Sequence, residues 1–244
     1  MWLPVTLAIL WFRDRQAPPI NVRHCKTWLL GAFALTAVPS GRSLTNPALQ
    51  ARPQEAKQAI AQTAREITPS AIELLQGLND RQVAEMNEAF AKDLRKRQQE
   101  YLEPSLDQQI KERSERMEKR LNDWLGPISP AQQQRVVSWS TALGDQNTQW
   151  IANRAHWQKQ FSAAVAQRQS PEFPQRIETL LVNRENLWTQ DYRKAYANTE
   201  AQARSLIVDL MAQSTPTQRQ RLQKKIDGVR KDFNDLKCLK SAQG

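Results

Sequence analysis

Hydrophobic residues recur at steps of three and four along most of the chain after residue 67. Over 79–101, Val83, Met86, Phe90 and Leu94 mark one face, with charged residues between them. This spacing places the apolar side chains on one stripe of a helix, whereas a strand would alternate every second residue. The pattern therefore predicts an amphipathic α-helix over 79–101.

Later segments repeat this spacing, and each repeat predicts a further helix with one buried face. The apolar positions are Leu106, Ile110, Met117, Leu121 and Trp124; Trp150, Trp157, Phe161 and Ala164; Trp188, Tyr192, Ala203, Leu206 and Leu210; and Leu222, Ile226, Val229, Phe233 and Leu236. Pro104 separates the first of these segments from 79–101, and Ser105 is suited to cap it. Seven glycines against many Gln, Ala, Arg, Leu and Glu also favour helices, so the fold class is expected to be all-α.

A capping signal recurs where these helices are expected to start. Ser, Thr or Asn accepts a backbone N–H of the first turn, and Gln three residues later reaches back to the cap, which forms a capping box. The cap residues and their glutamines are Thr68, with Ala71 in place of Gln; Asn79 and Gln82; Ser129 and Gln132; and Thr215 and Gln218. Pro69, Pro130 and Pro216 follow three of the caps, at the first helical position, where a missing N–H costs nothing. We expect helix starts at 68, 79, 129 and 215.

Two glycines precede these starts by one to three residues. Gly77 and Gly126 lie where the end of a helix requires a left-handed residue. The turns that follow are therefore short, and short connections make neighbouring helices antiparallel. The expected architecture is an antiparallel array of helical hairpins.

The N-terminal region has the features of a targeting segment. The apolar run 28–38 follows Arg23 and Lys26, precedes small residues, and is too short to span a membrane. We divide the chain into a signal-like segment, 1–43, and a helical domain, 44–244. An apolar stretch ahead of the basic flank suggests that translation starts near Val22, and the alternative is a buried amphipathic helix joined to the domain.

Charge and residue counts restrict the chemistry of the chain. The net charge is +10 and basic runs occur at 92–97 and 219–225. Acids are nevertheless interleaved with Lys and Arg along the chain, and export would separate the protein from nucleic acid, so nucleic acid is not an expected partner. The two histidines, His24 and His156, exclude multi-histidine metal sites, and no Gly-rich phosphate loop is present. We expect no catalytic, cofactor or metal site, and no enzyme, unless a site is assembled from Asp, Glu, Arg and Tyr.

Three tryptophans are close together in the sequence. Trp139, Trp150 and Trp157 can contribute to one aromatic cluster. Such a cluster is either part of the core or the lining of an apolar groove for a partner. Both interpretations stay open at this point, and the three residues are a candidate partner surface.

The order of the motifs is typical of one family. It runs from 78–82 into Glu100-Tyr101-Leu102, then through 120–126, 129–132 and Trp139 to 215–218. Over about 67–238 the chain resembles an uncharacterised family of proteobacterial envelope lipoproteins, a domain of unknown function. The resemblance implies an exported, lipid-anchored helical protein and supplies no activity or ligand. Arg42 stands where a lipoprotein signal would have its cysteine, which puts lipid anchoring in doubt.

The sequence thus leads to two hypotheses for function. The first is a periplasmic scaffold or interaction protein of the cell envelope that contacts other envelope proteins, with membrane association only through an N-terminal segment or a lipid. The alternative is a chaperone for unfolded clients, because the capping repeat is similar to the Leu-Thr-x-x-Gln repeats of Spy-type periplasmic proteins.

Overall fold

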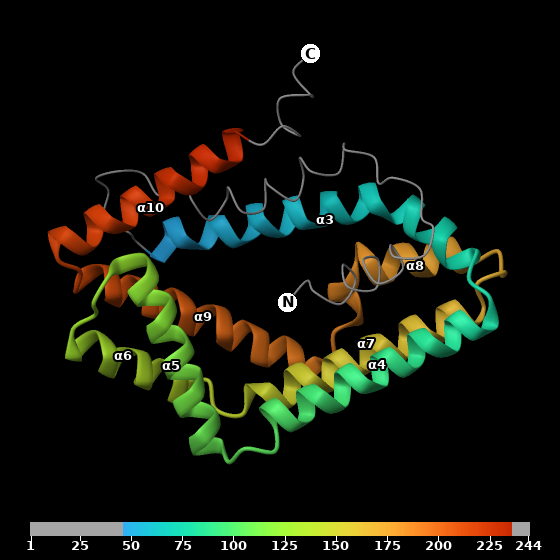
Figure 1. Ribbon diagram of the computed structural model, residues 1–244, viewed down its shortest axis with the longest axis horizontal. Coiled ribbons are helices and arrows are strands. Elements are labelled where there is room, and N and C mark those ends of the chain that lie inside the picture. Colours follow the sequence, from blue (N-terminus) through green and yellow to red (C-terminus); the bar gives the residue numbers. More distant parts are fainter. Residues whose placement is uncertain (1–45, 236–244) are drawn as a thin grey trace.

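The computed structural model describes residues 46–235, and this part of the chain is all-α, as expected, with no strand (Figure 1). Short turns join its helices. In chain order they are α3 (Asn46–Gln76), α4 (Asp80–Tyr101), α5 (Leu106–Leu125), α6 (Pro130–Ala142), α7 (Gln146–Ala166), α8 (Phe173–Leu181), the 3-10 helix η2 (Arg184–Leu187), α9 (Gln190–Ala212) and α10 (Pro216–Asp235). The signal-like segment 1–43 and the C-terminal residues 236–244 lie outside the described residues.

The helix start expected at Thr68 is wrong. Helix α3 continues through this position to Gln76, and the buried Thr68 hydroxyl donates to the carbonyl of Ala64 at 2.7 Å. The hydroxyl thus bonds back into the preceding turn instead of capping the next one. Pro69 removes the N–H that would bond to the carbonyl of Arg65, and its ring crowds that carbonyl. Burial of α3 side chains on both sides of Pro69 outweighs that local loss.

Three other starts agree with the expected positions to within one residue. Asn79, Ser129 and Thr215 immediately precede α4, α6 and α10. The glycine prediction holds at only one of its two positions. Gly126 ends α5 with φ +85°, whereas Gly77 has no left-handed φ and ends α3 through an ordinary bond to the carbonyl of Glu73.

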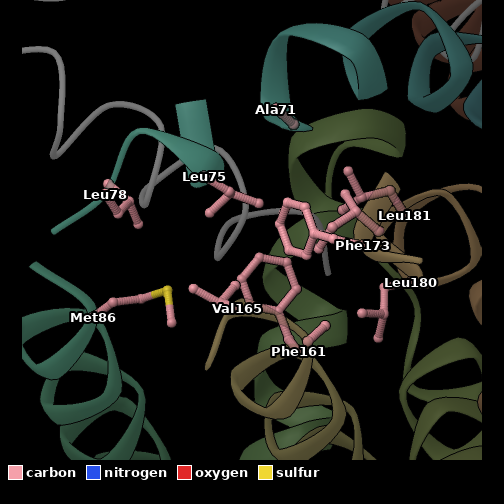
Figure 2. Packing of buried hydrophobic residues seen from close by; sticks show 11 residues of the cluster. Ala71, Leu75, Leu78, Met86, Phe161, Val165, Phe173, Leu180 and Leu181 are labelled. Atoms are coloured by element: carbon pink, nitrogen blue, oxygen red, sulfur yellow. The ribbon is translucent and has the colours of Figure 1, made fainter. Parts of the chain in front are cut away.

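The first core lies between the end of α3 and helices α4, α7 and α8. Figure 2 shows Phe161 and Phe173 directed into one apolar space, with Met86 reaching in from α4. The buried members are Ala71, Leu75, Leu78, Met86, Phe161, Ala164, Val165, Phe173, Ile177, Leu180 and Leu181. Phe173 and Ile177 are fully buried, so the short helix α8 supplies the centre of this core.

The second core lies between α5, α6 and α9. Its buried members are Val136, Trp139, Leu143, Leu206 and Leu210, with Met117 and Leu121 of α5 packed against them. This core has fewer buried apolar side chains than the first. Helices α5 and α9 contribute residues from the stripes recognised in the sequence, Met117 and Leu121 from α5 and Leu206 and Leu210 from α9.

Several helices pack mainly against partners that are distant in sequence. Consecutive pairs α5–α6 and α7–α8 are in contact, but α3 packs on α8, α4 on α7, α6 on α9 and α10 on α5. Helices α4 and α7 run side by side in Figure 1. The packing therefore adds long-range pairs to the hairpins that short turns suggest.

Candidate functional site

The Asn79 box is a capping box at the surface. The backbone N–H of Gln82 donates to Oδ1 of Asn79, and the backbone N–H of Asn79 donates to Oε1 of Gln82, both at 2.9 Å. Asn79 is exposed and Gln82 is half-buried. The hydrogen bonds of this capping box stabilise only the start of α4.

The other two boxes have the same geometry, with exposed cap residues and buried glutamines. The N–H of Gln132 donates to Oγ of Ser129 at 3.2 Å, and the N–H of Ser129 donates to Oε1 of Gln132 at 2.9 Å. The N–H of Gln218 donates to Oγ1 of Thr215 at 3.1 Å, and the N–H of Thr215 donates to Oε1 of Gln218 at 3.0 Å. The two glutamines are 0% and 7% exposed.

These two boxes meet through their buried glutamines, Gln132 and Gln218, which we call the amide pair. Nε2 of Gln218 donates to Oε1 of Gln132 at 3.0 Å, and Nε2 of Gln132 donates to Oε1 of Gln218 at 3.3 Å. Nε2 of Gln218 also donates to the carbonyl of Pro127 at 2.9 Å. The start of α10 is thus bonded to the start of α6, a contact between residues 86 positions apart that local patterns do not reveal.

The three tryptophans lie in separate environments, so the shared cluster is not formed. Trp139 is buried in the second core, and Trp157 packs against the first core while its Nε1 donates to the carbonyl of Leu180 at 3.0 Å. Trp150 makes an edge-to-face contact with Tyr101, with ring centroids 5.4 Å apart. A role of these residues in partner binding stays a hypothesis.

A charged cluster that was not predicted from the sequence links α4 and α7. Asp93 Oδ2 accepts hydrogen bonds from Nη2 and Nε of Arg154 at 2.6 and 2.9 Å, and both oxygens of Asp93 lie 3.1 Å from Nε of Arg97. The Arg97 guanidinium lies 5.6 Å from the Trp150 ring centroid. Spacing within α4 suggests the Asp93–Arg97 pair, but only the fold adds Arg154.

The two arginines of this cluster lower the pKa of the Asp93 carboxyl. Burial alone would raise the pKa of the Asp93 carboxyl, but hydrogen bonds and charge from Arg97 and Arg154 outweigh it, so the pKa lies below its ordinary value. Burial lowers the pKa of Arg154, and Asp93 opposes that effect. Both groups are therefore charged at neutral pH, and they form an ion pair between helices.

A second buried cation connects α5 to the end of α6. Nη1 of Arg113 donates to the carbonyl of Ser140 at 2.9 Å, and Nη2 donates to the carbonyl of Gly144 at 3.1 Å. Burial, and then the charge of Arg116, lowers the pKa of Arg113. The guanidinium lies where carbonyls at a helix C-terminus present partial negative charge, which stabilises a cation.

Three aromatic side chains pack together at the start of α9. The Trp188 ring contacts Tyr192 and Tyr196, with centroids 5.0 and 4.7 Å away. Burial, followed by the nearby Glu200 carboxylate, raises the pKa of Tyr196 to about 12. Its phenol is therefore protonated at neutral pH. Thr189 caps this helix by accepting the N–H of Tyr192 at 3.2 Å, a cap that the sequence analysis missed.

Neither a metal cluster nor a membrane span is found in 46–235. No group of three or more His, Cys, Asp or Glu side chains is arranged there to bind a metal ion. Within the same residues, no helix combines the length and apolar character needed to cross a bilayer.

Comparison with known proteins identifies the family of the chain. Residues 21–193 match a family of unknown function, DUF6279. No curated protein and no solved structure matches the chain. The match covers well over half of the sequence and confirms the expected resemblance to a domain of unknown function. The chain therefore belongs to the DUF6279 family.

Proposed function

We propose that this chain is a helical scaffold or interaction protein of the cell envelope, with no catalytic role. One observation carries the proposal: several buried or half-buried polar side chains of 46–235 form hydrogen bonds or ion pairs between helices. Arg113 joins α5 to α6, Arg154 joins α7 to α4, and the amide pair joins α6 to α10. Charged and amide groups that a catalytic site would use are here engaged in fixing helix positions. The proposed function therefore depends on residues at the outer surface of the helical domain, whose helices these bonds hold in place.

Cell fractionation tests the location that this proposal requires. The full chain is expected in the periplasmic or envelope fraction, and mass spectrometry of the mature N-terminus is expected to show cleavage of the signal-like segment. A matched chain that starts at Val22, changed to Met, should be exported equally well. Recovery only in the cytosol, from both starts, would rule out the envelope role.

A chaperone for unfolded clients is the second candidate, favoured by apolar side chains at the surface. Leu106, Trp124, Val137 and Ile207 are 39% to 46% exposed, on a chain with net charge +10. Exposed apolar side chains on a basic surface can bind unfolded acidic segments transiently.

Aggregation of a model client in the presence of an equimolar amount of the purified protein tests this second candidate. Suppression is expected, and Trp124→Gln combined with Ile207→Gln should reduce it. The matched control is Arg81→Gln, which removes an exposed charge and should leave suppression nearly unchanged. No suppression by the unmodified protein would remove this candidate.

A further inference from the structure

Over 216–229, helix α10 is attached to the rest of the molecule by few apolar side chains. In the part of α10 whose side chains are described, Ile226 is buried, whereas Leu222 and Val229 are only half-buried. Its main packing partner is α5. Because burial of apolar area is the largest stabilising contribution to helix packing, α10 is expected to open more readily than helices of the first core.

Polar contacts provide much of the remaining attachment. Gln218 exchanges hydrogen bonds with Gln132 in both directions and donates to Pro127, and all of these groups meet at the first turn of α10. Arg221 lies beside Gly126, with Cδ 3.2 Å from the position that a Cβ would take there. When α10 leaves, both amides regain water, so these hydrogen bonds favour the closed position by a modest net free energy that still permits opening.

The turn before α10 stays bonded to α9. Oγ of Ser214 donates to the carbonyl of Leu210 at 2.7 Å, and the N–H of Ser214 donates to the carbonyl of Met211 at 3.3 Å. A rotation of α10 would therefore take place just after this turn, next to Pro216. The residues matched to the family end at 193, so α10 lies outside the matched part.

We propose that α10 is a strap that opens as one unit about the Ser214–Thr215 turn, and that the amide pair is the latch that keeps it closed. Opening uncovers the start of α6 and the side of α5 on which α10 packs. The proposal does not depend on the function of the protein.

Hydrogen exchange followed by mass spectrometry on the full chain tests the strap. Amides of α10 between 218 and 229 are expected to exchange at least about tenfold faster than those around Ile151 and Phe161 in α7, after correction for intrinsic rates. Equal protection of the two helices would overturn the proposal.

Two matched variants test the latch. Gln218→Leu and Gln82→Leu each remove the glutamine of a capping box, but only the first also breaks the amide pair. Exchange in α10 is expected to accelerate roughly tenfold in Gln218→Leu, since Gln132 loses its buried partner, and to be unchanged in Gln82→Leu. Unchanged exchange in α10 of Gln218→Leu, or an equal acceleration in α7, would contradict the latch.

Gln218→Glu keeps the test decisive if Gln218→Leu does not fold. Below its pKa the carboxyl group of the new side chain is protonated and can donate to Oε1 of Gln132. Above its pKa the carboxylate has no hydrogen to donate, so its oxygen faces Oε1 of Gln132 and the carbonyl oxygen of Pro127 without a hydrogen bond to either. The latch predicts that corrected exchange in α10 accelerates as pH rises through that pKa in the variant and not in the unmodified chain. Exchange with no pH dependence in the variant would overturn the latch.

Discussion

The two cores of the molecule differ in the balance between apolar packing and polar bonds. The first, between α3, α4, α7 and α8, contains a large continuous apolar cluster with Phe161 and Phe173 at its centre, and the Asp93–Arg154 ion pair also joins α4 to α7. The second, between α5, α6 and α9, has a smaller apolar cluster, and polar bonds of Arg113 and of the amide pair connect its helices to each other and to α10. Apolar packing adds stability without direction, whereas hydrogen bonds set the position of one helix relative to the next. We therefore expect the first core to contribute most of the free energy of unfolding. We expect the second core to determine how α5, α6, α9 and α10 are placed relative to one another.

The largest expected effect is the loss of Phe173. Its side chain is 0% exposed, so Phe173→Ala removes a buried ring and leaves a cavity in the first core, which typically costs about 3–5 kcal/mol. Urea unfolding monitored by circular dichroism measures the change in the free energy of unfolding. Leu106→Ala, at a position 46% exposed, is the control and should change it by less than about 0.5 kcal/mol. A small effect of Phe173→Ala would show that the first core does not dominate stability.

Loss of the buried cation should have the next largest effect. Arg113→Met removes both donors from the carbonyls of Ser140 and Gly144, at an expected cost of about 1–3 kcal/mol in the same unfolding assay. Arg113→Lys keeps the charge but not the fork of donors, so it should recover only part of that loss. The control is Arg81→Met, where the side chain is 76% exposed. Equal stability of Arg113→Met and the unmodified chain would contradict the assigned role.

The sequence predicted the elements of both cores better than their contacts. Periodic stripes predicted helices over 79–101 and later segments because the stripes repeat over several turns. The nine residues of α8 were missed, since so short a helix shows little periodicity. Thr68 has the local features of a cap, but packing on both sides extends α3 through it.

The contact within the amide pair could not be predicted from local sequence patterns. Sequence spacing alone assigns Gln132 and Gln218 to the starts of their own helices, and both do accept the backbone N–H of their cap residues. Their contact with each other depends on how α6 and α10 are placed, which no local pattern encodes. The same reason explains why Arg154 was not recognised as a partner of Asp93.

An acidic pH should weaken the Asp93–Arg154 ion pair between α4 and α7. The pKa of Asp93 is lowered in the folded chain, so its stabilising contribution is complete above the unfolded value and is lost as pH falls through the folded value. Since Asp93 is partly exposed, we expect a contribution of about 1 kcal/mol at neutral pH. Asp93→Asn should remove this part of the dependence of unfolding free energy on pH between about 5 and 2. The exposed Asp123→Asn is the control, and the same pH dependence in both variants would show that the cluster contributes nothing.

The smallest expected effect separates a cap at the surface from a cap that also joins helices. Asn79→Ala removes the oxygen that accepts the N–H of Gln82, and the start of α4 is exposed, so water can replace the lost acceptor. The expected loss is about 0.5–1 kcal/mol, measured by urea unfolding. Ser129→Ala removes the corresponding oxygen from an exposed cap residue whose box includes the buried Gln132 of the amide pair, and should cost more, about 1 kcal/mol. Equal losses in the two variants would mean that the contact between α6 and α10 adds nothing to the cap, because only Ser129 lies beside a second helix start.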